Sequence, residues 1–506
     1  PVEWSSPSSR PSTRTFPSMF YKYSRKIDCD DASRVFSKIH GKYDKKFLLE
    51  SLDISQVYGR LSLIGVQPAL EICGKDEEFF IKACGERGKE FLKEINDEDL
   101  KLCDEVERSD TEISGKIVKK MGDFEEEKRT RRKNIAQIIR AILDRFKREE
   151  KGFFGLYGAF SYDFVRLFEE IPNNLPVNDV YDFRLGLYDT FVFFDHLKDE
   201  AEVVTYRKVE KFAKTDAEFV ARQIERGQEA NLKFKTKDSK FELGEDEYEE
   251  MVEGARKLAK EGELFEIVYS NTLKAGFEGD PFALYQKYRE ANPSPYLFYF
   301  DFGDEQLCGA SPEMMVRCER GIVQLRPISG TAKRGADPIE DHENMLELLK
   351  SEKERAELDM LIDLGRNDMA RICEPGIKVS DYRFVEKYSK VMHTVAHLSG
   401  KLRKEFQALD ALVACMNAGT LTGAPKVAAM IEIEKNEKSR RGYYGGAIGY
   451  LTFAGDMDTG IIIRTAHIKN GELSFRVGAT LLYDSVPENE YKETMSKAEA
   501  FLTTIR

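Results

Sequence analysis

Hydrophobic and polar positions divide this chain into segments with helical and with strand-like periodicity. Apolar residues recur at helical spacing over residues 119–150 and again from Tyr248 to Ala259, which predicts two amphipathic helices. Apolar runs rich in β-branched and aromatic residues predict strands, of which the clearest cover residues 60–66, 155–163, 190–195, 264–269, 297–300 and 321–326. Because helices and strands are interspersed along the whole chain, the expected class is α+β.

Charge and composition divide the chain into three parts. Residues 1–27 are rich in Ser, Pro and Arg and cannot build a core, so we expect a disordered leader or a segment added to the natural chain. A highly charged stretch at 208–244 marks the expected boundary between an N-terminal α+β domain, 28–235, and a second domain, 236–506. The length of 506 residues suits two or three domains.

The bulk composition excludes several classes of protein. With 33% charged residues and a net charge of −12, this is the composition of an acidic globular protein. Its most basic run, residues 128–133, follows three glutamates and is typical of a solvated helix face, so no nucleic-acid partner is expected. No apolar run reaches the roughly 20 residues of a membrane helix. Eight cysteines without a C-x-x-C pair indicate neither a zinc site nor a disulfide framework, which fits a cytoplasmic setting.

A turn in the second half can hold an anion. The strand at 321–326 leads into the predicted turn Ser329-Gly330-Thr331, whose glycine allows close backbone approach. Backbone N–H groups in such a turn suit a negatively charged ligand.

Two later helices each carry a pair of glutamates, Glu354 with Glu357 and Glu490 with Glu493. The i, i+3 spacing places both carboxylates of a pair on one helix face. Carboxylate oxygens suit Mg²⁺, which shares its ligand shell with water and substrate oxygens. Spacing alone favours solvated helix faces, because glutamate is common on helix surfaces.

Four polar residues stand in apolar segments. Arg464 ends an Ile run, where it needs either a substrate carboxylate or an internal salt bridge. His393 is either a general acid or base or a satisfied core histidine. Glu313 and Glu266 are either structural or acids with shifted pKa values, because a carboxylate in an apolar strand is costly unless it is paired or protonated.

A series of motifs runs in order over about residues 45–505: LLES, NPSPY, GASPE, RPISGT, ELDMLIDLGRND, VMH, GTLTGAPK, YGGAIGY, GIIIRTA and DSVPENEYKETMSKA. Together they resemble the chorismate-utilising enzymes, and most closely the large subunit (component I) of anthranilate synthase. The chain is especially similar to the branch fused to a glutaminase. The resemblance implies a two-part α+β chain with large antiparallel β-sheets packed face to face and helices outside.

The resemblance also implies a reaction and its residues. Chorismate and ammonia would give anthranilate and pyruvate, the first committed step of tryptophan biosynthesis, with ammonia from glutamine through a glutaminase (component II) partner in a hetero-oligomer. By motif, the implied Mg²⁺ ligands are Glu357 and Glu493, with Glu354 and Glu490 beside them. The implied chorismate contacts are Gly330, Thr331, Tyr444, Arg464, Gly478, Ala479 and Thr480. Glu313 stands where the general acid is expected and His393 where pyruvate elimination is assisted, and Thr331 and Glu266 complete the catalytic set.

A feedback site for tryptophan is implied at Glu50, Ser51, Pro295, Tyr296 and Leu297. This chain departs from many relatives at Thr480 and Glu266. Isochorismate- and salicylate-forming relatives have a Lys at the position of Glu266, where it deprotonates the attacking water. The carboxylate of Glu266 cannot do this in the same way, so it favours ammonia as the nucleophile. Aminodeoxychorismate synthases often carry a Lys where this chain has Ser329, which argues against that branch. These enzymes, and a non-catalytic tryptophan-binding relative, remain the alternatives.

Overall fold

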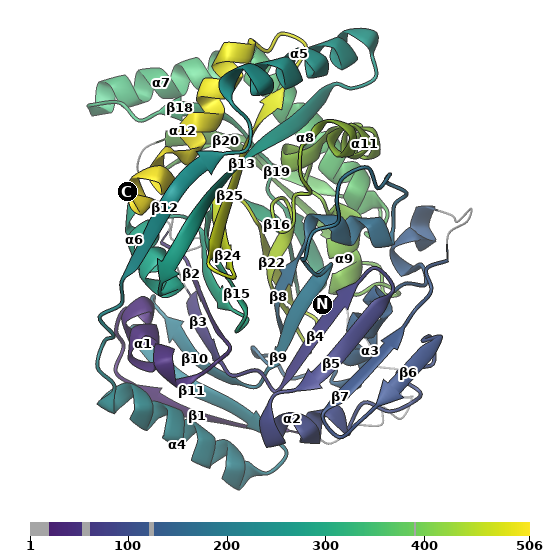
Figure 1. Cartoon of the computed structure of the whole chain (residues 1–506), viewed down its shortest axis with the longest axis vertical. Helices are drawn as coiled ribbons and strands as arrows, with labels where there is room; N and C mark the ends of the chain where they lie inside the picture. The colour runs from purple at the N-terminus through teal and green to yellow at the C-terminus, as the bar shows by residue number, and fades with distance from the viewer. Residues whose placement is uncertain (1–19, 53–60, 121–125, 389–390) are drawn as a thin grey trace, which may run out of the picture.

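The computed structural model describes residues 20–52, 61–120, 126–388 and 391–506. Within them the strands form two antiparallel sheets, one of 12 strands and one of 13, and the helices lie outside them (Figure 1). This arrangement confirms the predicted α+β class with large antiparallel sheets. No helix among the described residues is long and apolar enough to cross a membrane.

The first sheet contains, in spatial order, β1 (Tyr21–Ile27), β11 (Glu200–Arg207), β10 (Thr190–Asp195), β3 (Leu61–Val66), β2 (Lys46–Glu50), β14 (Tyr296–Asp301), β15 (Glu305–Ser311), β24 (Thr465–Lys469), β25 (Glu472–Leu481), β13 (Glu266–Gly279) and β12 (Phe234–Phe241), with β21 (Gly423–Ala424) beside β13. The second contains β18 (Ile328–Lys333), β20 (Val391–Lys401), β17 (Ile322–Leu325), β16 (Met314–Glu319), β23 (Met457–Ile461), β22 (Ala447–Thr452), β8 (Gly155–Phe160), β9 (Phe183–Tyr188), β4 (Leu70–Lys75), β5 (Glu78–Ala83), β7 (Glu112–Lys116) and β6 (Glu105–Arg108), with β19 (Lys378–Lys387) beside β20. Each sheet takes strands from both sides of the expected boundary at 235/236, so the two segments share both sheets.

The helices are α1 (Ala32–Ile39), α2 (Gly85–Leu92), α3 (Ala136–Arg145), α4 (Glu210–Arg226), α5 (Glu245–Glu261), α6 (Pro281–Ala291), α7 (Pro338–Lys350), α8 (Glu352–Ala370), α9 (Ala408–Cys415), α10 (Gly419–Thr422), α11 (Lys426–Asn436) and α12 (Pro487–Ile505), with short 3₁₀ turns at His40–Lys42, Glu126–Arg131 and Tyr162–Leu167. Helices α5, α7, α8 and α12 gather at one end of the sheets (Figure 1). That end carries the carboxylate pairs.

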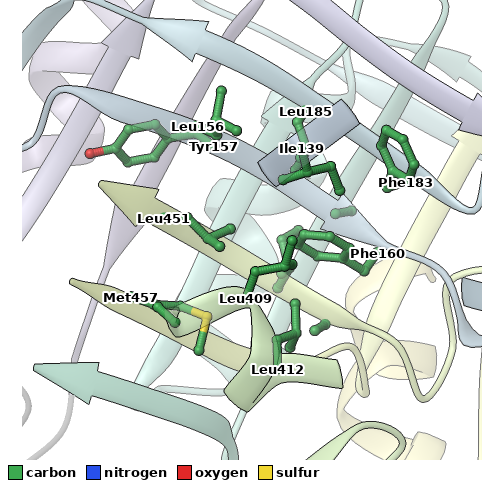
Figure 2. Packing of buried hydrophobic residues seen from close by; sticks show 14 of the residues in the cluster. Ile139, Leu156, Tyr157, Phe160, Phe183, Leu185, Leu409, Leu412, Leu451 and Met457 are labelled. Atoms are coloured by element: carbon green, nitrogen blue, oxygen red, sulfur yellow. The ribbon is translucent and has the colours of Figure 1, made fainter. Parts of the chain in front are cut away.

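Aromatic side chains join the two sheets. Phe47 of β2 stacks on Tyr157 of β8 with ring centroids 4.7 Å apart, and Tyr157 also contacts Phe191 of β10. On the other face of β8, Phe160 belongs to the same buried cluster as Leu409 of α9, and Figure 2 shows these side chains close together. Side chains alternate between the two faces of β8, so one set is buried between the sheets and the other is buried under helices.

The predicted leader is too long at its C-terminal end. Residues 21–27 form β1, which pairs with β11 along its whole length, and the ring of Phe20 stacks on Phe91 at 5.2 Å. The average composition of residues 1–27 gave no sign of this strand, because its hydrogen-bond partners lie in β11, far along the chain. Residues 1–19 lie outside the described residues.

Two further local predictions are wrong. Among the described residues of the helix expected over 119–150, only α3 is α-helical. The side chain of Asn134 accepts a hydrogen bond from the N–H of Ala136 at 2.9 Å and so favours a helix start there. The turn expected at 329–331 lies within β18, where the register against β20 shifts between Ser329 and Thr331 and Gly330 has φ +69°. A glycine bulge therefore replaces the turn.

A buried charge network also joins the sheets. Arg184 of β9 donates to Glu71 of the same sheet at 2.8 Å and, across the interface, to Glu305 at 2.8 Å and Asp304 at 2.6 Å. Burial alone would raise the pKa of Glu305, but His467 and Arg184 outweigh it and lower that pKa to about 2. The stability that Glu305 contributes is therefore present above pH 4.5 and is lost as the pH falls towards 2.

Replacing Arg184 by methionine is expected to lower the free energy of unfolding by roughly 3 kcal/mol, because Glu71 and Glu305 then remain buried with fewer partners. Chemical denaturation at pH 7 measures this change. Lys492→Met is the control, since Lys492 pairs with Glu488 at an exposed helix surface and its loss is expected to leave stability unchanged. Equal stability of the two variants would contradict a structural role for the network.

Candidate active site

Strands β18 and β20 bring Gly330, Thr331 and His393 together. Thr331 pairs with His393, whose Nδ1 lies 3.0 Å from Thr331 Oγ1 and 3.0 Å from the carbonyl oxygen of Gly330. A carbonyl oxygen only accepts, so Nδ1 carries the proton and Nε2 is unprotonated. Burial lowers the pKa of His393 to about 4, although the bond to Gly330 partly opposes it. At neutral pH the ring is therefore neutral, with a lone pair on Nε2.

Glu313 lies between β15 and β16 and is buried. Burial raises its pKa to about 8, although a hydrogen bond from Thr420 Oγ1 at 3.0 Å and the charge of Arg464 lower it in part. Glu313 is thus largely protonated at pH 7 and can act as an acid.

The charge of Arg464 acts on both groups and lowers the pKa of Glu313 and of His393. Its φ is +50°, and its carbonyl oxygen accepts a hydrogen bond from Ala310 N–H at 3.1 Å. In the part of the chain that the structure describes, no carboxylate lies within ion-pair distance of Arg464. The internal salt bridge considered from the sequence is thus absent there.

Strand β25 forms another wall. A side chain at Gly478 would place its Cβ 2.5 Å from the carbonyl oxygen of Tyr269 and 3.1 Å from the hydroxyl of Tyr444, so only glycine fits. Tyr444 therefore lies against this strand. Alternation along β25 puts Gly478 and Thr480 on one face and Ala479 on the other. The side chain of Ala479 packs in a hydrophobic cluster with Tyr269, so at most its backbone faces the site.

The paired glutamates lie on α8 and α12. Ser351 caps α8 by accepting a hydrogen bond from Glu354 N–H, and this fixes where the first pair falls on the helix. Helix α8 packs on β18 and β20, while α12 packs on β25 and α5. Glu354 is thus carried close to Gly330, where an added Cβ would lie 2.8 Å from Glu354 Oε2.

The carboxylates of the two pairs influence one another's pKa. Burial, and then repulsion from nearby carboxylates including Glu493, raises the pKa of Glu354 and Glu357. Burial likewise raises the pKa of Glu490, with Glu493 adding to it, and raises that of Glu266 to about 8, with Glu357 as the second cause. Yet no three His, Cys, Asp or Glu side chains among the described residues converge as a finished metal site. Mutually repelling oxygen donors nevertheless fit a hard cation.

Comparison with known proteins identifies a family for this chain. The family model described as chorismate binding enzyme matches residues 101–503. The chain belongs to this family. Its curated relatives include anthranilate synthase component 1 of Aquifex aeolicus, 34% identical over 95% of this chain and 93% of the relative, and that of Methanothermobacter thermautotrophicus, 35% identical with the same coverage.

Solved structures agree with the family assignment. Component I of anthranilate synthase from Streptococcus pneumoniae superposes with a TM-score of 0.70 at 32% identity and covers 90% of this chain and 94% of that chain. The menaquinone-specific isochorismate synthase of Escherichia coli, 16% identical with a TM-score of 0.68, shares the fold and covers 96% and 95% of the two chains.

A separate cavity of about 610 Å³ is lined by strands of both sheets. Its lining includes all five residues assigned to a feedback site, namely Glu50, Ser51, Pro295, Tyr296 and Leu297. Glu50 accepts a hydrogen bond from Tyr285 and pairs with Arg289, whereas the hydroxyl of Ser51 has no hydrogen-bond partner among the described residues. The remaining wall is mostly apolar. An amphipathic ligand of modest size would fit here.

Sequence reasoning missed residues that act on the predicted ones. Thr420 contacts Glu313, and Lys497 joins Glu493 at 2.8 Å to the carbonyl oxygen of Gly478 at 3.0 Å. Both lie in motifs that carried the family resemblance, GTLTGAPK and the final segment, but no role was assigned to them. Only the folded chain reveals their partners.

Proposed function

We propose that this chain is the large subunit of an anthranilate synthase and converts chorismate and ammonia to anthranilate, pyruvate and water. The observation that carries the proposal is a protonated Glu313 and a neutral His393 that both feel the charge of Arg464, which has no carboxylate partner among the described residues. Such a set offers an acid, a base and a carboxylate-binding cation.

The chain's residues divide the chemistry among them. Arg464 binds a substrate carboxylate, and the backbone at Gly330 and Gly478 permits close approach of the ring. Glu313 donates its proton to the departing C4 hydroxyl while ammonia adds at C2. As pyruvate leaves and the ring becomes aromatic, the lone pair on His393 Nε2 is suited to accept the proton released. Ser329, which is not a lysine, offers no amine for a covalent route.

Magnesium is part of the proposal. Glu354, Glu357, Glu490 and Glu493 would hold Mg²⁺, with Glu266 close to Glu357. The raised pKa values of Glu266, Glu354, Glu357 and Glu490 support the need for a cation there. When bound, the ion would neutralise the ring carboxylate and act as a template for the substrate.

The test is the product formed from chorismate. The protein is mixed with chorismate, an ammonium salt and MgCl₂, and anthranilate is followed by its fluorescence and by chromatography. Accumulation of isochorismate, salicylate or aminodeoxychorismate would refute the proposal, and tryptophan binding without turnover would point to a regulatory relative. Glutamine is expected to replace ammonium only when a glutaminase subunit is added.

We also propose that the 610 Å³ cavity binds tryptophan as a feedback inhibitor. Its apolar wall suits an indole ring, and the unpartnered hydroxyl of Ser51 suits the polar end of an amino acid. The cavity shares strands with the active site. Tyr296 donates to Asp458 of β23 at 3.0 Å, and the N–H of Ile461 on that strand donates to the carbonyl oxygen of Glu313 at 3.0 Å. A ligand beside Tyr296 can therefore act on Glu313 through β23.

Ser51→Phe is expected to raise the tryptophan concentration for half-inhibition by at least about tenfold, because the larger ring fills the cavity, and a tenfold loss corresponds to about 1.4 kcal/mol. Turnover without tryptophan is expected to persist. Inhibition curves and calorimetry measure the effect. Ser51→Ala, which removes the hydroxyl without filling the cavity, separates the loss of that contact from the steric effect of phenylalanine. Unchanged sensitivity in Ser51→Phe would exclude this cavity.

A further inference from the structure

Strand β13 has a gap along one edge. Strand β21 pairs with its first two residues, and β12 pairs from Leu273 onwards, so Val268 and Ser270 have no strand partner on that side. Two side chains fill the gap. Arg441 Nη2 donates to the carbonyl oxygen of Val268 at 2.6 Å, and the N–H of Ser270 donates to Glu437 Oε1 at 2.9 Å. An ion pair thus takes the place of a neighbouring strand.

This ion pair is fully enclosed. The side chains of Arg441 and Glu437 are 1% and 0% exposed, and they meet through two hydrogen bonds of 2.6 and 3.1 Å. Burial would raise the pKa of Glu437, but the charges of Arg441 and Arg476 outweigh it and lower that pKa, so the carboxylate stays ionised. The hydroxyl of Ser270 donates to the same carboxylate at 2.7 Å.

The other side of Arg441 reaches the active site. Its Nη1 donates to the carbonyl oxygen of Leu421 in α10 at 2.5 Å, and the preceding residue, Thr420, is the one that donates to Glu313. The guanidinium also lies over the ring of Tyr444, 5.5 Å from its centroid. Arg441 therefore contacts strand β13, helix α10 and the ring of Tyr444, all of which belong to the candidate active site.

We propose that Arg441 and Glu437 are positioning residues, which hold α10 and Tyr444 against β13 so that Thr420 keeps its hydrogen bond to Glu313. This inference rests on the proposed function. Neither side chain reaches the substrate; both act through the groups that do. A buried ion pair is in general weak evidence for stability, whereas fixing a unique arrangement is a use that agrees with these contacts. Arg207 and Asp189 provide a comparison, because this buried pair ties β11 to the residue before β10, and its other ionic partners are Asp216 of α4 and Arg87 of α2. None of these residues is assigned to the active site.

The test compares Arg441→Met, Arg441→Lys and Thr420→Val with the control Arg207→Met. We expect Arg441→Met to lower kcat by about 10- to 100-fold, as is typical when a partner that orients a reacting group is lost. Because the Thr420 bond lowers the pKa of Glu313, its loss should shift the alkaline limb of kcat/KM to higher pH. Thr420→Val should shift the limb in the same direction, and Arg441→Lys should restore part of kcat.

A second readout does not depend on turnover. Infrared titration of the protonated carboxyl band that disappears in Glu313→Gln should show the same shift to higher pH in Arg441→Met and none in Arg207→Met. If Arg441→Met does not fold, Arg441→Lys is compared with the wild type and with Arg207→Met instead. Loss of activity with the limb and the band unmoved would overturn the inference. A wild-type product other than anthranilate would overturn the proposed function instead, and the infrared shift would still test Arg441.

Discussion

Glu313→Gln is expected to lower kcat by about 10²- to 10⁴-fold, the range that a positioned general acid contributes. Glutamine preserves the shape and can still accept the hydrogen bond from Thr420, but it has no acidic proton to give. Wild-type kcat/KM should fall as the pH rises through about 8, because the raised pKa of Glu313 leaves the acid form populated only below that pH. This limb should be absent from the variant. Steady-state kinetics from pH 6 to 9.5 measures both effects.

The matched control is Glu319→Gln, which removes an exposed carboxyl group at the end of the adjoining strand β16 and should leave kcat unchanged. Near-normal turnover in Glu313→Gln, or an alkaline limb that persists in it, would exclude Glu313 as the proton donor. His393 does not contribute to the fall of kcat/KM at high pH. Burial lowers its pKa to about 4, so its neutral form is present from pH 6 to 9.5.

Glu357→Gln should lower kcat/KM at fixed Mg²⁺ by at least about 100-fold, since the charge stabilisation that a metal provides is worth several kcal/mol and each 1.36 kcal/mol is tenfold. Without metal, the variant should melt no lower than the wild type, because it loses a carboxylate whose pKa is raised by burial and by Glu354. Adding MgCl₂ should raise the melting temperature of the wild type and not that of the variant. Chelation should abolish wild-type turnover.

The control for this prediction is Glu352→Gln, in the first turn of the same helix, whose carboxylate is exposed and pairs with Arg355. It should retain both the activity and the response to MgCl₂. A Glu357→Gln protein that still turns over chorismate, or that is still stabilised by MgCl₂, would remove Glu357 from the metal site. Glu493→Gln is expected to behave as Glu357→Gln does.

Local signals predicted the helices that carry the glutamates. The i, i+3 spacing of Glu354 and Glu357 places them on one face, and α8 bears this out, because spacing within a helix depends only on the helix itself. Prediction of secondary structure failed where it depends on a partner that is distant in the sequence. Residues 21–27 become a strand because β11 supplies their hydrogen bonds, and β18 continues through Gly330 because β20 pairs with it on both sides of a bulge.

By itself the sequence determined the α+β class, the main helices and strands of the second half, and, through its ordered motifs, the family. The tertiary structure alone decided the chemical state of the site. The pKa values of Glu313 and His393 are set by burial and by neighbours such as Arg464, and the edge of β13 is completed by Arg441, 173 residues from Val268. Burial and long-range contacts exist only once the chain has folded, so residue type and spacing cannot specify them.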